Sequence, residues 1–136
     1  MAGVTADEGA KVVADLLYLG SNADRGTSLQ LGLFTNTANQ STLKGLPLTS
    51  ITEPSGGGYA RKTLVNANWT RNIGTSGYAA QVFTAGAGGY TGQIYGYFIA
   101  TTGVTPRLLH VEIDLLGPYT LNENDTYSVT PSILTS

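Results

Sequence analysis

The sequence predicts an all-β fold: an antiparallel β-sandwich of the jelly-roll or immunoglobulin-like type, with one short N-terminal α-helix. Short segments of alternating apolar and polar residues are separated by turns rich in glycine. The 18 glycines and 8 tyrosines, against a single methionine, favour turns and strands over helices. The 136 residues contain no repeat or linker and predict one domain, with an arm and helix at residues 1–20 and the sandwich at residues 21–136.

The clearest pair of strands lies at residues 94–101 and 108–115. The first segment is apolar almost throughout, as expected of a strand that is covered on both faces. In the second segment apolar and polar residues alternate, so one face is expected to be buried and the other solvated. The expected polar face carries His110, Glu112 and Asp114. We therefore expect a central strand beside a half-exposed one, with the rest of the chain packed on this hairpin.

Residues 1–20 contain the only segment with a convincing helical pattern. Thr5 and Glu8 have the spacing of a capping box, in which the two side chains accept hydrogen bonds from backbone N–H groups of the first turn. An apolar face follows, and Gly20 is placed to end the helix. That face consists of Val12, Val13, Leu16 and Leu17. A helix this short must dock on something to be stable, either on the sandwich or on a neighbouring subunit.

The remaining strands are predicted from alternation and from the turns between them. Leu29, Leu31 and Leu33 share one side of residues 27–34 and predict an inward face. Residues 43–51 are interrupted by a glycine and a proline, so we expect an edge or a loop there. Further strands are predicted at residues 59–65, 78–84 and 127–130, and turns at residues 74–77 and 85–89.

Composition excludes several classes of function. Only 12% of the residues are charged, against about 25% in a typical soluble domain. A net charge of −2 argues against nucleic acid as a main partner, because phosphate binding needs a surplus of Lys and Arg. Without cysteine there is no disulfide and no thiolate metal site. No apolar run reaches the length of a membrane helix, and we expect no signal peptide and no membrane partner.

The sequence offers little catalytic chemistry. The glycine-rich segment at residues 86–92 precedes a strand, whereas phosphate-binding loops precede a helix. The polar face of residues 110–114 could present an imidazole and carboxylates to a metal or substrate, but it is also what a solvated strand face looks like. His110 is the single histidine, and no G-x-S-x-G motif is present. We expect no catalytic residue, no metal, no cofactor and no enzymatic activity.

Two sets of residues are candidates for binding. Arg61, Lys62 and Arg71 surround Trp69 in the sequence, and Arg with Trp is the composition of interface hot spots. These four are the predicted interaction residues, with the Trp69 ring at the edge of the core and its N–H hydrogen-bonded. The tyrosines could line a sugar-binding face, although core and interface positions are the better explanation for them. They are Tyr59, Tyr78, Tyr90, Tyr95, Tyr97, Tyr119 and Tyr127.

The order of these features resembles a known class of proteins. The short helix is followed by LQLGLFTN at residues 29–36, GYARKTL at 58–64 with Trp69 behind it, YGYF at 95–98, LLHVE at 108–112 and YSVTPSI at 127–133. This order is similar to that of small virion structural proteins of tailed bacteriophages, including phages of cyanobacteria and marine bacteria. The members that it resembles most are capsid decoration, or cement, proteins.

The resemblance implies a role but transfers no site residues. It implies a non-enzymatic β-rich protein, made in the host cytoplasm, that binds the major capsid protein on the outer surface of the virion, commonly as a homotrimer. Such a protein would stabilise the shell by bridging its subunits. The alternative is a module of a tail fibre or spike that binds a host glycan or receptor, although the chain lacks a long fibrous repeat.

Overall fold

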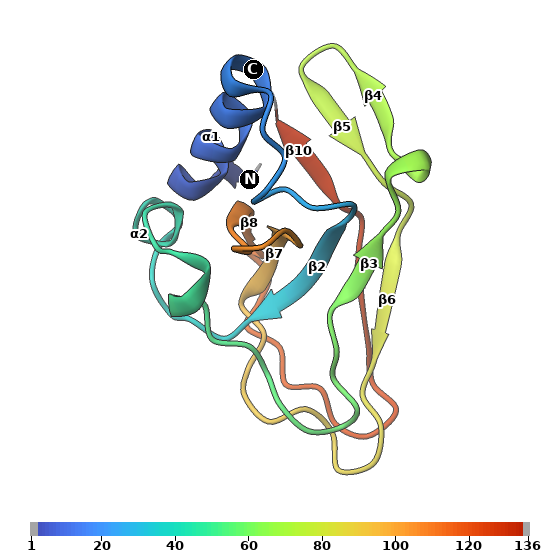
Figure 1. Ribbon diagram of the computed structural model, residues 1–136. Helices are drawn as coiled ribbons and strands as arrows, with labels where there is room; N and C mark the ends of the chain where they lie inside the picture. Colours follow the sequence, from blue (N-terminus) through green and yellow to red (C-terminus); the bar gives the residue numbers. More distant parts are fainter. Residues whose placement is uncertain (1–2, 135–136) are drawn as a thin grey trace.

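The computed structural model describes residues 3–134, and most of its regular structure is β. The sheets are antiparallel and one short helix lies near the N-terminus, as predicted (Figure 1). The strands are β1 (Val4–Thr5), β2 (Leu29–Phe34), β3 (Lys62–Leu64), β4 (Thr70–Asn72), β5 (Thr75–Gly77), β6 (Gln81–Thr84), β7 (Gly96–Thr101), β8 (Leu108–Ile113), β9 (Thr126–Val129) and β10 (Ser132–Leu134). The helical segments are α1 (Asp7–Ala14), η1 (Asp15–Leu19), α2 (Gln40–Lys44), η2 (Leu48–Ser50) and η3 (Asn66–Asn68).

A five-stranded antiparallel sheet in the order β1-β8-β7-β2-β3 forms the centre of the fold. The predicted hairpin is confirmed: β7 pairs with β8, with Phe98 opposite Val111. On its other side β7 pairs with β2, where Ile99 lies opposite Leu31. Every residue of β7 is buried, because the strand has a neighbour on each side and a layer on each face. Its continuous apolar sequence therefore marks the central strand.

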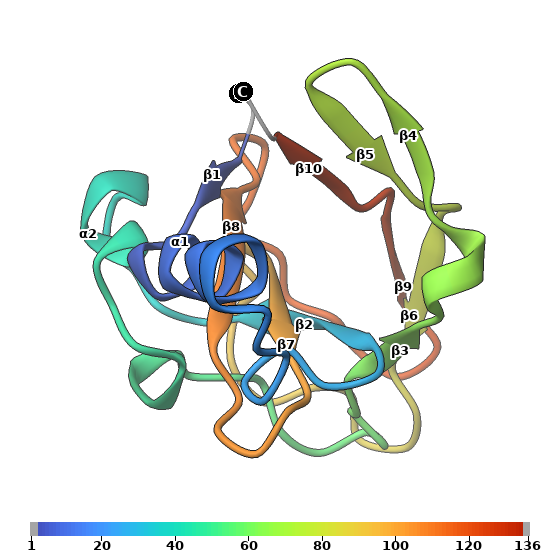
Figure 2. The same ribbon diagram turned by 45° about the horizontal axis from the view of Figure 1, so that its top comes forward.

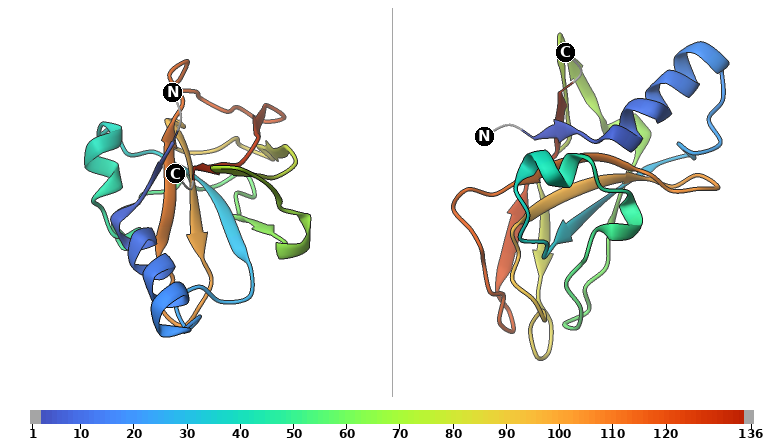
Figure 3. Two further views of the ribbon diagram at one scale, coloured as in Figure 1. Left: turned by 90° about the horizontal axis from the view of Figure 1, so that it is seen from above. Right: turned by 90° about the vertical axis from the view of Figure 1, so that its left-hand side faces the viewer.

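One face of the five-stranded sheet is covered by helices. In Figures 2 and 3, α1 and α2 lie on one side of β7 and β8, and β4 and β5 lie on the other. The side chains between the helices and the sheet form one buried cluster, which we call the helix-side core. It consists of Ala6, Phe34, Leu43, Leu48, Phe98, Ala100, Leu108 and Val111.

The opposite face packs on the smaller sheets, β6-β9 and β10-β5-β4. The predicted inward residues of β2 all lie in this second cluster, the strand-side core. Phe83 of β6 and Val129 of β9 cover them from the other layer. The cluster consists of Leu29, Leu31, Leu33, Leu64, Phe83, Ala85, Tyr90, Ile94, Tyr97, Ile99, Leu109, Leu121 and Val129.

The prediction of a half-solvated β8 is wrong for its first four residues. Residues 108–111 are all buried, and the side chain of His110 is only 1% exposed. An irregularity in the pairing between Ile99 and Ala100 places both Leu109 and His110 on the strand-side face. Gly3 then lies so close to the His110 imidazole that a side chain at residue 3 would collide with it. Of the predicted polar face, only Glu112 and Asp114 keep partial exposure.

Helix α1 occupies the predicted segment, but its ends and its buried face differ from the prediction. Thr5 belongs to β1, and the N-cap is Ala6, which provides no side-chain hydrogen bond, so the predicted capping box is wrong. Gly20 ends the helical segment with φ of 63°, as predicted. Gly9 allows α1 to approach the sheet, because a Cβ there would lie 2.5 Å from the Leu109 carbonyl oxygen. Of the predicted apolar face only Val12 is fully buried.

Glu8 connects α1 to two distant segments. Its Oε2 accepts hydrogen bonds from the backbone N–H of Leu48 at 2.9 Å and of Leu108 at 2.8 Å. Its Oε1 accepts a longer one, at 3.4 Å, from the Arg107 guanidinium. The carboxylate therefore holds the helix, the η2 turn and the start of β8 together.

We expect the substitution Glu8→Ala to lower the free energy of unfolding by about 2 kcal/mol, because it leaves two backbone N–H groups without their acceptor. Asp7→Ala is the matched control, since the Asp7 side chain forms an exposed ion pair with Lys44 and its loss should change stability by less than about 0.5 kcal/mol. Urea unfolding of the two variants measures the difference. Equal stabilities would contradict a connecting role for Glu8.

Two parts of the structure were not predicted. Helix α2 runs into residues 43–51, where the sequence indicated an edge or a loop. Asn39 caps it by accepting a hydrogen bond from the Thr42 N–H at 2.8 Å. The predicted turn at residues 74–77 is mostly strand β5, which pairs with both β4 and β10. These strands have three residues each and little apolar alternation, so the pattern that reveals a strand in a sequence is missing.

Candidate functional site

The structure does not bring the four predicted interaction residues together. Arg61 is half-buried in an ion pair with Glu53, with 2.9 Å between Nη2 and Oε2, and lies over the Phe98 ring at 5.2 Å. Lys62 follows it in the chain and points to the other face, where its Nζ lies 5.1 Å from the centre of the Phe83 ring. These two cations are therefore held by internal partners.

Trp69 and Arg71 lie together in a separate place. They line a mostly apolar groove of about 560 Å³, between the end of the helical segment and the sheet β10-β5-β4. Its apolar walls are formed by Val13, Leu16, Leu29, Trp69, Leu109 and Ile133. Arg71 is exposed, and within residues 3–134 it forms no ion pair. We call this depression the apolar groove. Of the four predicted interaction residues, Trp69 and Arg71 therefore lie together in it.

The Trp69 ring packs at the edge of the strand-side core, as predicted. It makes an edge contact with the Tyr78 ring, with 5.2 Å between the ring centres. Its Nε1 is buried, and no group among residues 3–134 accepts a hydrogen bond from it, which corrects the predicted bond. The indole is therefore held by packing.

The end of the helical segment presents unpaired apolar side chains beside this groove. Leu17, Tyr18 and Leu19 are 72%, 82% and 75% exposed, and Val13, which lines the groove, is 43% exposed. We call Leu17, Tyr18 and Leu19 the helix-end patch, whereas Val13 belongs to the wall of the apolar groove. Three consecutive exposed apolar residues form a contiguous apolar surface, which on a folded domain is typical of an interaction site. The patch and the apolar groove together form a surface suited to protein contact.

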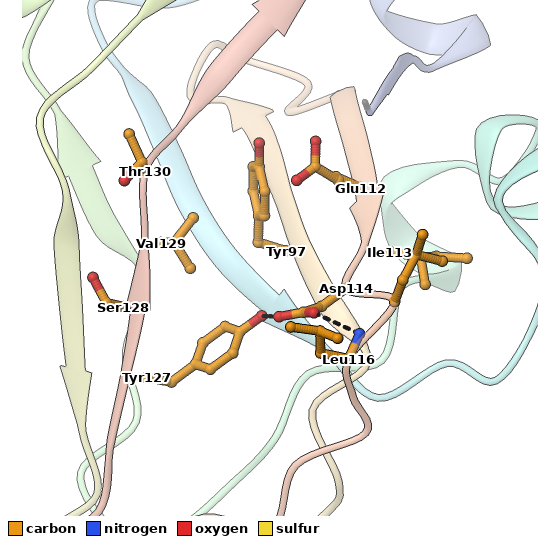
Figure 4. Close-up of a pocket in the computed structure, with 10 residues that line it drawn as sticks. Tyr97, Glu112, Ile113, Asp114, Leu116, Tyr127, Ser128, Val129 and Thr130 are labelled. Atoms are coloured by element: carbon orange, nitrogen blue, oxygen red, sulfur yellow. Dashed lines mark hydrogen bonds between the residues drawn. The ribbon is translucent and has the colours of Figure 1, made fainter. Parts of the chain in front are cut away.

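A second depression is polar and lies near the opposite end of β8. It consists of two adjoining pockets of about 410 and 620 Å³ that share Asp114, Tyr127 and Ser128. We call this the polar groove. The first pocket also contains Tyr97 and Glu112, and the second also contains Tyr119, Thr120, Asn124, Asp125 and Thr126. Figure 4 shows the Tyr127 side chain reaching from β9 to Asp114 at the end of β8.

Asp114 is held from two sides. Its Oδ2 accepts the Tyr127 O–H at 2.7 Å and its Oδ1 accepts the Leu116 N–H at 3.0 Å. Burial and the neighbouring Asp114 carboxylate raise the pKa of Tyr127, so the phenol stays protonated and donates a hydrogen bond to the carboxylate. The Tyr119 and Tyr127 rings lie 5.3 Å apart and are inclined by 48°, which gives the second pocket an aromatic wall.

Glu112 and Asp114 point to the same side of the sheet, as the alternation predicted. Burial raises the pKa of Glu112, and the like charge of Asp114 raises it further, while a hydrogen bond to the Gly3 backbone lowers it. The residues that line the polar groove include these two carboxylates and Asp125, and none of these lining residues is Lys or Arg. The groove is therefore negatively charged and rich in hydroxyl groups.

Part of the polar groove could be recognised in the sequence. The tyrosines that the sequence offers for a sugar-binding face include Tyr97, Tyr119 and Tyr127, and the predicted polar strand face includes Glu112 and Asp114. The pairing of Tyr127 with Asp114 gave no sequence signal, because β9 pairs with β6 and reaches β8 only through the packing of the two layers. The proximity of these groups therefore depends on the tertiary structure.

His110 does not take part in either groove. Burial lowers its pKa to about 4, and its ring nitrogens have no hydrogen-bonding partner among residues 3–134. Within the same residues, no group of three or more His, Asp or Glu side chains is arranged to bind a metal ion. The described helices are also all too short or too polar to cross a lipid bilayer.

Comparisons with known proteins identify no relative. Neither the protein-family models, nor the curated proteins, nor the solved structures contain a match to this chain.

Proposed function

We propose that this chain is a non-enzymatic decoration, or cement, protein of a tailed-bacteriophage capsid. In this proposal it is made in the host cytoplasm, binds the major capsid protein on the outer surface of the virion, and acts as a homotrimer. We also propose that its two layers of strands belong to the jelly-roll or immunoglobulin-like type of sandwich. The sequence resemblance described above supports the proposal, and the observation that carries it is the helix-end patch beside the apolar groove.

The patch and the groove are complementary surfaces on one molecule. Leu17, Tyr18 and Leu19 project from the helix, and the groove beside them is lined by apolar side chains. We propose that the patch of one copy enters the groove of a second copy. Such a contact joins two different surfaces, so a rotation that closes after three copies forms a trimeric ring.

The exposed area is consistent with such a contact. The three side chains present roughly 400 Å² of surface, about half of what each partner buries in an interface of standard size. The walls of the groove supply the remaining apolar area. Two of the residues that line the groove, Arg25 and Arg71, are ionised, so the desolvation of ionised groups that opposes the association is limited to these two guanidinium groups.

Binding to the shell is tested by mixing the purified chain with mature phage shells that lack it and measuring co-sedimentation. We expect saturable binding at a multiple set by the icosahedral lattice, because each equivalent position on the shell takes one oligomer. Many symmetric contacts then add to a large total stabilisation of the shell. Absence of binding to the shell would contradict the decoration role.

Self-association is tested with the double variant Leu17→Lys/Leu19→Lys. We expect it to weaken association at least tenfold and to yield monomers, because two buried ammonium groups would have no partner in the groove. Light scattering coupled to size-exclusion chromatography measures the mass. Val82→Lys is the matched control, since Val82 is an exposed apolar residue of β6 outside the patch. An unchanged mass of the double variant, or a monomeric unmodified chain, would contradict the proposed contact.

The second candidate is a module of a tail fibre or spike that binds a host glycan or receptor. The polar groove favours it, because tyrosine rings, hydroxyl groups and carboxylates are the groups that bind sugars. A chain that fails to bind shells but binds host polysaccharide on an array would support this second candidate.

A further inference from the structure

We propose that the polar groove binds a neutral oligosaccharide. This inference does not depend on a capsid or a tail location, because the groove is separate from the helix-end patch and the apolar groove. Its two pockets, of about 410 and 620 Å³, fall in the range of sites that bury small ligands. They adjoin at Asp114 and Tyr127, so a chain of sugar rings can occupy both.

The aromatic wall provides the apolar part of the site. Sugar rings have faces made of C–H groups, which pack on aromatic rings. Tyr119 and Tyr127 are only partly buried, and their rings lie next to each other at 5.3 Å on the wall of the second pocket. Each also carries a hydroxyl group, so the wall combines an apolar surface with polar edges.

The carboxylates provide oriented acceptors for sugar hydroxyl groups. Asp114 is held by the Tyr127 O–H at 2.7 Å and the Leu116 N–H at 3.0 Å, so its orientation is set before a ligand binds. Each carboxylate oxygen has a second lone pair that can accept an O–H from a sugar. Hydrogen bonds to an ionised acceptor are stronger than neutral ones, and a preorganised acceptor costs less entropy on binding.

The remaining lining selects the charge of the ligand. Thr120, Asn124, Thr126, Ser128 and Thr130 offer hydroxyl and amide groups that hydrogen-bond to neutral polyols. Glu112, Asp114 and Asp125 repel carboxylated, sulfated or phosphorylated sugars, and no Lys or Arg is found among the residues lining the two pockets. A basic peptide would satisfy the three carboxylates, but it would make no use of the five small polar side chains. The composition therefore favours a neutral sugar.

The first experiment is an array of neutral, amino and acidic oligosaccharides probed with the full chain. We expect binding to neutral oligosaccharides and none to acidic ones. The best neutral oligosaccharide is then titrated by calorimetry against the unmodified chain and its variants. Absence of binding to every neutral oligosaccharide, or equal binding of acidic ones, would overturn the proposal.

Variants of two groove residues test whether the oligosaccharide binds in the polar groove. Asp114→Asn removes the charged acceptor and should weaken binding at least tenfold, and Tyr127→Phe, which keeps the ring but frees Asp114, should weaken it about threefold to tenfold. Asp7→Asn is the matched control, because Asp7 is an exposed carboxylate on α1 and should not change the affinity. Circular dichroism verifies that each variant is folded. Unchanged affinity of both groove variants would overturn the proposal, as would binding of an oligolysine peptide at the affinity measured for the sugar.

Failure of this proposal is distinguishable from failure of the proposed function. Shell binding is measured by co-sedimentation and self-association by mass, and self-association depends on the helix-end patch, whereas sugar binding is measured by titration and depends on Asp114 and Tyr127. A Leu17→Lys/Leu19→Lys chain should bind each sugar with unchanged affinity per site, although its avidity for an array would fall.

Discussion

Replacing Phe98 with alanine is expected to lower the free energy of unfolding by about 3–5 kcal/mol. Phe98 is fully buried in the central strand and belongs to the helix-side core. Its ring fills the space above Gly32, where any side chain would collide with it, and it lies under the Arg61 guanidinium at 5.2 Å. Alanine leaves a cavity that these neighbours cannot fill, because Gly32 has no side chain and Arg61 is held by Glu53.

Urea unfolding followed by circular dichroism measures this loss. Val82→Ala on β6 is the control, because Val82 is 49% exposed and its truncation should cost less than about 1 kcal/mol. Phe98→Leu should cost less than Phe98→Ala, since most of the volume is kept. A loss below about 1 kcal/mol for Phe98→Ala would mean that the helices do not form a second core on the sheet.

Lowering the pH from 6.5 to 4 is expected to remove about 3 kcal/mol of stability through His110 alone. Burial lowers the pKa of this histidine from 6.5 to about 4 in the folded chain. The imidazole is 1% exposed, and its ring nitrogens have no hydrogen-bonding partner within residues 3–134. Burying the charged form of the imidazole without a partner therefore costs more free energy than burying the neutral form.

Stability decreases as the pH falls because the pKa of His110 is lower in the folded chain than in the unfolded chain. Between pH 4 and 6.5 the unfolded chain binds a proton at His110 and the folded chain does not. Stability from this group is therefore fully present above pH 6.5 and decreases as the pH falls toward 4. Carboxylates also titrate in this range, so the test compares the unmodified chain with His110→Phe, which keeps a ring and cannot be protonated.

Free energies of unfolding at pH 7 and at pH 4 measure the effect for both chains. We expect the unmodified chain to lose about 3 kcal/mol more than His110→Phe over this interval. Equal losses would contradict the burial of His110. The Tyr97 ring, whose centre lies 6.1 Å from that of the imidazole, covers one side of it, so Tyr97→Ala should reduce the difference by admitting water.

The four predicted interaction residues are close in the sequence, but the direction in which each side chain points separates them in the structure. Arg61, Lys62, Trp69 and Arg71 are close in the sequence, and their composition indicated an interface. Because adjacent residues of an extended chain point to opposite faces, Arg61, just before β3, reaches Phe98 in one core and Lys62 reaches Phe83 in the other. Whether Trp69 and Arg71 bind a partner stays a prediction, now placed at the apolar groove.

For the N-terminal helical segment, the position could be predicted from the sequence but the contacts with distant segments could not. The sequence indicated its position and its end at Gly20, since capping glycines act locally. The role of Glu8 could not be predicted, because its acceptor oxygens bind N–H groups 40 and 100 residues away in the chain. Likewise, the predicted apolar face is exposed at Leu17, because no segment among residues 3–134 covers this side chain.

By itself the sequence determined the mostly β class, the buried central strand and the inward face of β2, because these depend on local apolar periodicity. Only the tertiary structure decided the burial of His110, the exposure of the helix-end patch and the junction of Tyr127 with Asp114. Each of these depends on which distant segment packs against a given face. That choice is set by the free energy of the whole packed chain, and no short stretch of residues encodes it.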